Sequence, residues 1–229
     1  MSYFPLITIE GADGVGKSTL IETLYSELAE KGYSVKKYRH PGETDVGTMV
    51  RSMVIDLDIN LSPMTQALLI LANRTQLVEQ VLTHDINNGT IVLIDRWDLS
   101  TEIYQTCVYE SEQTTHFGIG DEVSQRITDF HQRLHQVIKL TEPSIPRATI
   151  LLDADDATLD QRRPFNGDDR FERMDHHFKR RLRQKYRIAQ PRLLYEGACY
   201  TLNTDHPLTE ADYDGLLDFI LGQRTDPAT

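Results

Sequence analysis

The sequence predicts a three-layer α/β fold, in which a five-stranded parallel sheet lies between helices. Short apolar, β-branched segments alternate with longer amphipathic segments along the chain. The first apolar segment also runs directly into a glycine-rich loop that precedes a helix. Parallel strands need helical crossovers, which cover both faces of the sheet. We expect residues 1–229 to form a single domain with a flexible tail at about 223–229.

The expected strands are short segments of apolar and β-branched residues. They are Leu6–Glu10, Ser34–Arg39, Thr90–Asp95, Ala148–Asp153 and Cys199–Asn203. The segment TIVLID at 90–95 is the clearest buried strand, and it ends in an acid. That acid is expected to lie beside the loop that follows the first strand, because parallel strands end at one edge of the sheet.

The expected helices have apolar residues at three- and four-residue spacing. They are Lys17–Lys31, Thr44–Ile55, Pro63–Asn87, Glu122–Leu140 and Thr209–Gly222. In the first, Leu20, Leu24 and Leu28 are predicted to face the core, and Gly32 ends the helix. In the third, the predicted apolar stripe runs through Leu68, Leu71 and Val78.

Composition narrows the classes of partner. The formal net charge is −11, so the chain has no general attraction to nucleic acid or to an anionic membrane. No apolar run approaches the length of about 20 residues that spans a bilayer. The two cysteines, Cys107 and Cys199, are too few for a disulfide framework. These observations predict a cytoplasmic protein with neither a nucleic-acid nor a membrane partner.

The segment GADGVGKS at residues 11–18 fits the phosphate-binding pattern G-x-x-x-x-G-K-[ST] at every fixed position. Its glycines allow a tight turn whose backbone N–H groups point at phosphate oxygens, and the following helix adds its positive dipole end. The predicted nucleotide-binding residues are Gly11, Ala12, Asp13, Gly14, Val15, Gly16, Lys17, Ser18 and Thr19. Lys17 is expected to bridge the β- and γ-phosphates of a nucleoside triphosphate, and Ser18 and Asp95 are expected to contact Mg²⁺.

Three classes of protein share such a loop. A switch GTPase needs a guanine-reading N-K-x-D segment, which this sequence lacks. A P-loop ATPase that works with a protein partner stays open as an alternative. A small-molecule kinase needs a mobile basic lid over the phosphates, and residues 161–173 (QRRPFNGDDRFER) are the candidate. The alternative for this segment is a solvated loop whose arginines pair with Asp168, Asp169 and Glu172.

Five motifs in order resemble those of the thymidylate kinases, a family of P-loop nucleoside monophosphate kinases. They are ITIEGADGVGKST at 7–19, RHPGETDVG at 39–47, LLILANR at 68–74, DRWDLSTEIYQ at 95–105 and DDRFE at 168–172. The resemblance spans roughly residues 5–220. It implies transfer of the γ-phosphoryl group of ATP to a deoxypyrimidine monophosphate, above all dTMP, to give dTDP. It also implies a homodimer.

The resemblance further implies a role for individual residues. Asp13 and Arg96 would lie near the acceptor and the transferring group, while Arg39 and Arg51 would join Arg96 in holding the acceptor phosphate. The base and sugar pocket would be formed by Ile70, Arg74, Trp97, Ser100, Thr101, Tyr104 and Gln105. Gly14 stands where some members carry a basic residue, and the charge would then come from the lid arginines Arg162, Arg163 and Arg170.

Departures from the family pattern concern the substrate more than the phosphates. Ile70 replaces the aromatic ring that usually stacks on the base, and Trp97, His40 and Glu43 replace Tyr, Glu and Gly. The stretch 107–146 is also longer than the family norm and carries no readable motif. A different or modified deoxynucleoside monophosphate therefore stays open as the acceptor.

Overall fold

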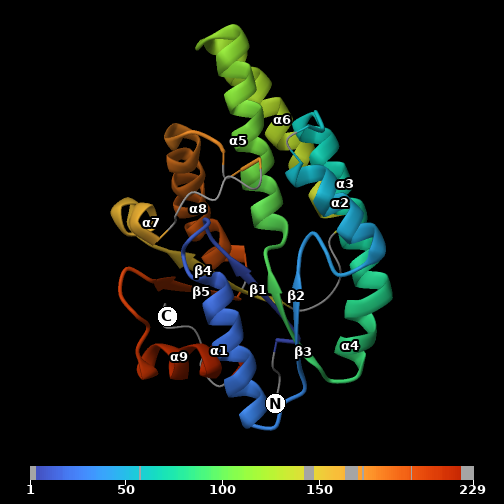
Figure 1. Ribbon diagram of the computed structural model, residues 1–229, viewed down its shortest axis with the longest axis vertical. Coiled ribbons are helices and arrows are strands. Elements are labelled where there is room, and N and C mark those ends of the chain that lie inside the picture. Colours follow the sequence, from blue (N-terminus) through green and yellow to red (C-terminus); the bar gives the residue numbers. More distant parts are fainter. Residues whose placement is uncertain are drawn as a thin grey trace.

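The computed structural model describes residues 4–56, 58–141, 147–162, 170–171, 173–196 and 198–222. Five strands form one sheet: β1 (Leu6–Glu10), β2 (Val35–Arg39), β3 (Ile91–Asp95), β4 (Arg147–Asp153) and β5 (Ala198–Asn203). Their order is β2-β3-β1-β4-β5, and every neighbouring pair is parallel (Figure 1). The predicted five-stranded parallel sheet is therefore confirmed, with each strand within one residue of its expected bounds.

Helices connect and flank these strands. They are α1 (Lys17–Glu30), α2 (Asp45–Ile55), α3 (Pro63–Leu77), α4 (Thr83–Asn87), α5 (Asp98–Phe117), α6 (Asp121–Leu140), α7 (Asp156–Arg162), α8 (His176–Glu196) and α9 (Glu210–Ile220). Polar side chains cap several of the starts, including those beside the pocket: Thr44 accepts a hydrogen bond from Gly47 N at the start of α2, and Ser62 accepts one from Thr65 N at the start of α3.

Two expectations for residues 63–87 were only partly correct, although Leu71 and Val78 of the predicted stripe do pack against buried residues. The segment is divided by a π-helical turn, η1 (Val78–Leu82), between α3 and α4. Leu68 is 48% exposed, whereas Ala67, Ile70 and Leu71 are buried. The buried face of α3 is displaced from the predicted stripe because three helices, α2, α5 and α6, pack against it. Periodicity within one helix does not reveal how many neighbours it has.

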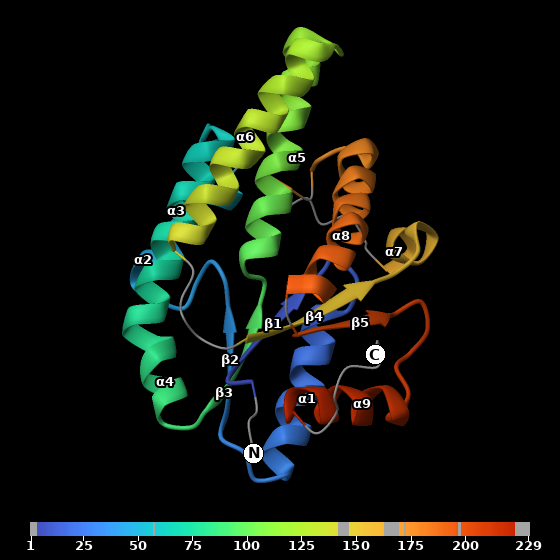
Figure 2. The same ribbon diagram turned by 180° about the vertical axis from the view of Figure 1, so that it is seen from behind.

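The sheet is covered on both faces, as predicted. Helix α1 packs on β1, β2 and β3 with α9 beside it, while α4 and α8 contact the sheet from the opposite face (Figures 1 and 2). The central strands β1 and β3 are wholly buried, and the edge strand β2 is only partly so. Leu20, Leu24 and Leu28 of α1 lie in the main core, as expected.

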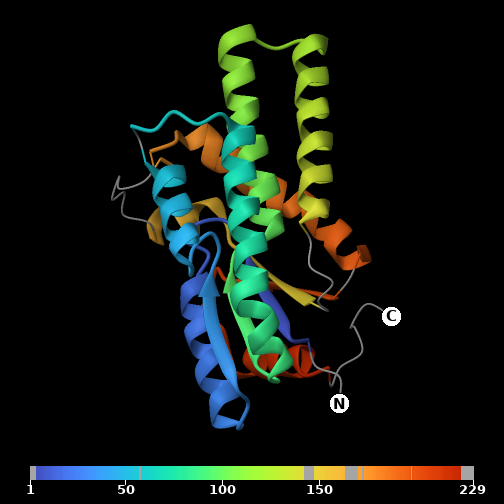
Figure 3. The same ribbon diagram turned by 90° about the vertical axis from the view of Figure 1, so that its right-hand side faces the viewer.

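The long stretch after Cys107 forms most of a helical hairpin. Helices α5 and α6 run antiparallel and stand out beyond the rest of the molecule (Figure 3). Tyr109 of α5 stacks on Phe130 of α6 with ring centroids 4.1 Å apart. Near its base, α6 also packs on Ala67 and Leu71 of α3. Within the residues described, no helix combines the length and the apolar character needed to cross a membrane.

Candidate active site

The loop between β1 and α1 has the backbone geometry that phosphate binding requires. Gly11, Gly14 and Gly16 have φ angles of 138°, 85° and 96°, a region that other residues rarely adopt. A Cβ atom on Gly11 would lie only 2.5 Å from the carbonyl oxygen of Leu152 in β4. Gly16 is the N-cap of α1, so the first backbone N–H groups of this helix face the loop without a capping side chain. These donors suit an anion.

Lys17 folds over this loop. Its Nζ donates hydrogen bonds to the carbonyl oxygens of Gly11 (3.0 Å) and Ala12 (2.8 Å), and the residue is only 6% exposed. Burial lowers the pKa of Lys17 to about 8, and the nearby charge of Arg96 acts in the same direction. Phosphate oxygens would be stronger acceptors than the two carbonyls, and their charge would favour the protonated amine.

Asp95 and Ser18 have features suited to Mg²⁺. Asp95 ends β3; its Oδ1 is buried without a hydrogen-bond partner in the described part of the chain, and its Oδ2 lies 3.7 Å from Nε of Arg39. Ser18 is exposed on the first turn of α1. Among the residues described, no group of three or more His, Cys, Asp or Glu side chains could hold a metal. A cation bound here would take most of its coordinating oxygens from phosphate and water, as Mg²⁺ usually does.

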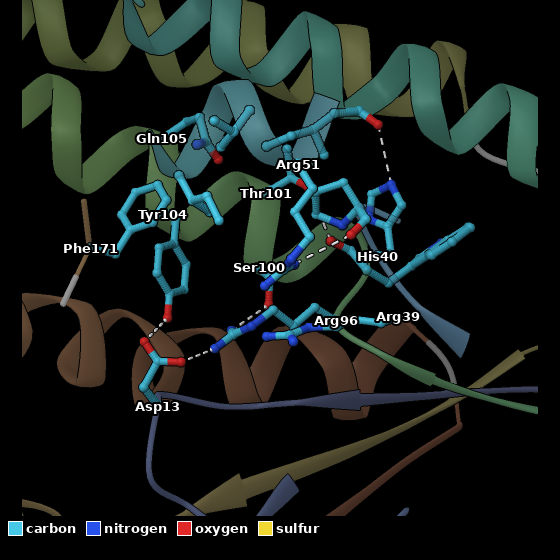
Figure 4. A pocket seen from close by; sticks show the side chains of 15 residues that line it. Asp13, Arg39, His40, Arg51, Arg96, Ser100, Thr101, Tyr104, Gln105 and Phe171 are labelled. Carbon is cyan, nitrogen blue, oxygen red and sulfur yellow. Dashed lines mark hydrogen bonds and ion pairs between the residues drawn. The ribbon is translucent and has the colours of Figure 1, made fainter. Parts of the chain in front are cut away.

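A central pocket opens beside the loop, where β1, β2 and β3 end against α2, α3 and α5 (Figure 4). Its lining residues are Asp13, Arg39, His40, Pro41, Arg51, Val54, Ile55, Ile70, Arg96, Trp97, Ser100, Thr101, Tyr104, Gln105 and Phe171. They include every residue predicted to contact the acceptor except Arg74. Three guanidinium groups, on Arg39, Arg51 and Arg96, make the pocket suitable for an anion.

Arg96 and Asp13 join the pocket to the loop. Arg96 follows β3 directly and has a φ of 69°. Its NH2 pairs with Asp13 Oδ1, and its NH1 donates to Ser100 Oγ (3.1 Å). The hydroxyl of Tyr104 donates to the other oxygen of Asp13 at 2.7 Å. A charged group of the pocket is thus held against the tip of the phosphate-binding loop.

Arg74, which the resemblance places at the base, is not among the residues that line the central pocket. It is 0% exposed and lies behind the pocket wall, with its guanidinium 4.7 Å from the ring centroid of Trp97. Its NH2 donates to Thr101 Oγ1 at 3.4 Å. Because Trp97 and Thr101 line the pocket, Arg74 supports two lining residues from behind.

Two arginines of the predicted lid, Arg162 and Arg170, contact separate segments of the chain. Arg162 donates to the carbonyl oxygen of Thr204, which follows β5, whereas Arg170 donates to the carbonyl oxygen of Ile59 in the α2–α3 connection. Arg163 lies outside the described residues, as do Asp168, Asp169 and Glu172. Of this segment, Phe171 reaches the pocket, where its ring meets Tyr104 edge-on with centroids 5.1 Å apart.

His40 was identified from the sequence only as a departure from the family pattern. In the structure it is buried and forms part of the pocket wall. Its Nε2 lies 3.2 Å from the carbonyl oxygen of Ile70, and its ring centroid is 5.0 Å from that of Trp97. Burial, together with the charge of Arg74, holds the pKa of His40 well below its usual value. His40 is therefore neutral at pH 7, unlike the glutamate of the family motif.

Two further residues were missed, Glu10 and Tyr186. Glu10 is wholly buried at the end of β1 and accepts a hydrogen bond from Trp97 N at 2.8 Å. The Tyr186 hydroxyl, from α8, lies 3.3 Å from Arg96 NH1. An acid at the end of a short, mostly apolar strand is a signal that could have marked Glu10, because a buried carboxylate needs partners. Tyr186 lies in a basic helical segment, and no sequence pattern around it indicates a role in the site.

Comparison with known proteins agrees with this geometry. The family model described as thymidylate kinase matches residues 9–116. The thymidylate kinase of Deinococcus radiodurans is 36% identical over 188 residues, which is 81% of this chain and 82% of that protein. That of Rhodopirellula baltica is 38% identical over 115 residues, 50% of this chain and 47% of that protein.

A solved structure supports the fold. The thymidylate kinase of Candida albicans superposes with a TM-score of 0.70 over 96% of this chain and 92% of that one, at 21% identity. At that identity the likeness concerns the fold alone, whereas the match to the Deinococcus protein covers most of both sequences at a higher identity. The chain belongs to the thymidylate kinase family.

Proposed function

We propose that this protein transfers the γ-phosphoryl group of ATP to a deoxypyrimidine monophosphate, with dTMP as the acceptor and dTDP as the product. One observation carries the proposal. The ion pair between Arg96 and Asp13 joins a phosphate-binding loop to a pocket that holds three arginines. A donor on the loop and an acceptor phosphate in the pocket would therefore meet at Arg96.

On the donor side, the backbone N–H groups of residues 11–18 and the ammonium group of Lys17 would hold the phosphates. Ser18 and Asp95 would hold Mg²⁺, which neutralises charge on the donor phosphates when it is bound. The buried, unpartnered Oδ1 of Asp95 supports this assignment within the described residues.

On the acceptor side, Arg39, Arg51 and Arg96 would bind the acceptor phosphate. The attacking oxygen is already anionic, so no strong general base is needed, and positioning with charge neutralisation supplies most of the catalysis. Arg96 would act on both substrates, because its side chain contacts the loop through Asp13 and the pocket through Ser100.

The inner end of the central pocket suits a pyrimidine. Ile70 and Val54 offer an aliphatic wall, and Thr101 and Gln105 offer polar atoms. The Oε1 of Gln105 is buried and has no hydrogen-bond partner among the described residues, so a base N–H could supply one. Tyr104, which is held by Asp13, would crowd a ribose 2′-hydroxyl and favour deoxynucleotides. In this arrangement Arg74 would act on the base through Thr101.

The lid arginines Arg162 and Arg170 would contact the transferring group only after exchanging their present hydrogen-bond acceptors. Arg162 and Arg170 now donate to backbone carbonyls of separate segments. For these two, with Arg163, to contact the transferring group, phosphate oxygens would have to replace those carbonyls. The exchange is chemically reasonable, because a charged acceptor binds a guanidinium more strongly than a neutral one.

The proposal is tested by ADP release with Mg-ATP and a panel of monophosphates: dTMP, dUMP, 5-modified dUMPs, dCMP, dGMP, dAMP and UMP. We expect turnover to be fastest with dTMP. Activity on another monophosphate alone would keep the chemistry and assign the altered specificity to Ile70, His40 and Trp97. ATP hydrolysis that no monophosphate stimulates would instead support the partner-dependent ATPase.

We also propose that the protein is a homodimer that associates through α2 and α3. Val46 and Met49 of α2 and Leu68 of α3 are exposed large hydrophobic residues on two helices that pack together. Light scattering after size exclusion should give twice the monomer mass, and Leu68→Glu should shift it towards the monomer. A monomeric wild-type protein would contradict this. A cytoplasmic location and the lack of nucleic-acid and membrane partners stay predictions from the sequence.

A further inference from the structure

We propose that Tyr186 is a positioning residue for Arg96, acting through a buried hydrogen-bond relay that runs from Tyr186 to Ser100 and ends on Glu10. The inference deepens the proposed phosphoryl transfer and rests on it. Tyr186 lies on α8, does not line the central pocket and would touch neither substrate. Its effect would be exerted through the guanidinium that joins the two halves of the site.

The relay is compact and buried. Tyr186 is 2% exposed, and its hydroxyl lies 2.8 Å from Ser100 Oγ and 3.3 Å from Arg96 NH1. Ser100 is on the first turn of α5, and its Oγ contacts Glu10 Oε2. Arg96 NH1 lies 3.1 Å from the same Oγ. Three side chains, those of Tyr186 on α8, Glu10 on β1 and Arg96 after β3, therefore contact the hydroxyl group of Ser100.

The hydrogens of this cluster have one consistent arrangement when Glu10 is ionised. A carboxylate only accepts, so Ser100 gives its single proton to Glu10. The hydroxyl of Tyr186 must then donate to Ser100 Oγ. Arg96 NH1 donates to the remaining lone pairs of Ser100 and Tyr186. Each hydroxyl thus accepts from Arg96 while its own proton points away from the guanidinium.

Glu10 anchors the relay to the sheet. Its Oε1 accepts hydrogen bonds from the backbone N–H groups of Trp97 (2.8 Å) and Ser100 (3.2 Å), at the start of α5. Burial raises the pKa of Glu10, and the hydrogen bond from Ser100 opposes that effect. The carboxylate therefore fixes both the start of α5 and the direction of the Ser100 hydroxyl.

Arg96 needs such support because its backbone is unfavourable. A φ of 69° is uncommon for a residue with a side chain, and it persists only where neighbours determine it. Arg96 N donates to the Ile9 carbonyl at 3.0 Å, and its NH2 pairs with Asp13. The orientation of NH1 is set by Ser100, Tyr186 and the carbonyl oxygen of Gly11 at 3.3 Å. Removing the Tyr186 hydroxyl takes away one acceptor of Arg96 NH1 and also removes the donor to Ser100 Oγ.

The first test is Tyr186→Phe, which removes one oxygen and keeps the ring. We expect kcat to fall about tenfold, because a hydrogen bond to a charged group is lost at the reacting centre. The KM for ATP should be unchanged, since the relay does not touch Lys17 or the loop amides. The matched control is Tyr200→Phe, whose ring packs on Phe219 away from the site and whose activity should equal that of wild type.

A double-mutant cycle separates positioning from a general structural role. In an Arg96→Lys background, Tyr186→Phe should lower kcat by less than twofold, because the guanidinium it acts on is absent. A tenfold loss in that background, or a normal kcat in the single variant, would overturn the proposal. Ser100→Ala, tested in the same cycle, gives a second readout should Tyr186→Phe fail to fold.

A readout without turnover distinguishes this proposal from the proposed function. In a crystal structure of Tyr186→Phe, NH1 of Arg96 should have moved from Ser100 or should occupy more than one position. An unmoved Arg96 would refute the relay even in an active enzyme. If wild type and Tyr200→Phe turn over no monophosphate, the proposed function fails, while a displaced Arg96 would still support the relay.

Discussion

The phosphate-binding loop and the central pocket are adjacent but are built on different principles. The loop is one contiguous segment, residues 11–18, whose backbone does the binding and whose glycines have positive φ angles. The pocket is assembled from side chains of separate segments, which follow β1, β2 and β3, lie on α2, α3 and α5, or, for Phe171, lie between α7 and α8. Its members are up to 158 positions apart in the chain, from Asp13 to Phe171 (171 − 13).

This difference indicates where the chain tolerates change. Backbone geometry leaves no freedom at Gly11, where a Cβ would strike the carbonyl oxygen of Leu152. Side-chain walls can be rebuilt, and here His40 and Trp97 pack on each other where the family pattern has Glu and Tyr. We therefore expect changes in the loop to abolish chemistry or folding, and changes in the pocket to alter acceptor binding.

The largest expected effect is that of Lys17→Ala. We expect kcat to fall at least about 100-fold, because removing one preorganised charge at a transferring phosphoryl group lowers the rate by about this factor or more. The melting temperature should be unchanged or higher, because burial disfavours the lysine charge. ADP release and a thermal melt measure the two quantities. A loss of less than tenfold in kcat would contradict the expectation that changes in the loop abolish the chemistry.

Gly11→Ala tests whether the positive φ angle and the close Leu152 oxygen exclude a side chain at this position of the loop. We expect the free energy of unfolding to fall by about 3 kcal/mol, from the positive φ and the close Leu152 oxygen together. Gly120→Ala is the matched control, because its backbone is extended and its Cβ would meet nothing within 4 Å. It should cost less than about 1 kcal/mol. If urea unfolding gave equal losses of unfolding free energy for the two variants, the constraint at Gly11 would be contradicted.

Arg51→Ala tests the pocket. Arg51 is only partly buried, and its NH1 donates to the carbonyl oxygen of Pro41 at 3.4 Å. We expect the KM for the acceptor to rise about tenfold, as for a lost charged hydrogen bond, with the KM for ATP and the melting temperature little changed. Steady-state kinetics with each substrate varied in turn will decide. A raised KM for ATP instead would place Arg51 on the donor side.

The smallest effect is a pH dependence of ATP binding. The pKa of Lys17 is about 8 in the free protein, and bound phosphates should raise it. Between pH 7 and 9 the protonated fraction falls about tenfold, so the affinity for ATP should fall by up to about tenfold. Calorimetry at both pH values measures this. Lys17→Arg keeps its charge and should show no such fall; a flat profile for wild type would refute the shifted pKa.

The same group affects stability in the opposite direction. In the unfolded chain the pKa of a lysine is about 10.4, so between pH 8 and that value the unfolded state binds more protons than the folded state. The contribution of Lys17 to the free energy of unfolding therefore rises with pH across this window.

The sequence by itself determined the sheet, most of the helices and the phosphate-binding loop. These depend on interactions between residues close in the chain: the short apolar, β-branched segment Leu6–Glu10, the repeat of Leu20, Leu24 and Leu28, and the glycines of residues 11–16. It also assigned the acceptor residues through the order of five motifs, and all but Arg74 line the central pocket.

Only the tertiary structure decided what surrounds those residues. Leu68 is exposed because three helices together fix the buried face of α3. Arg74 lies behind Trp97, and Glu10, Ser100 and Tyr186 meet across 176 positions (186 − 10), which no local pattern encodes. The physical reason is that hydrogen bonds and burial depend on distance in space, whereas periodicity and motifs record distance along the chain.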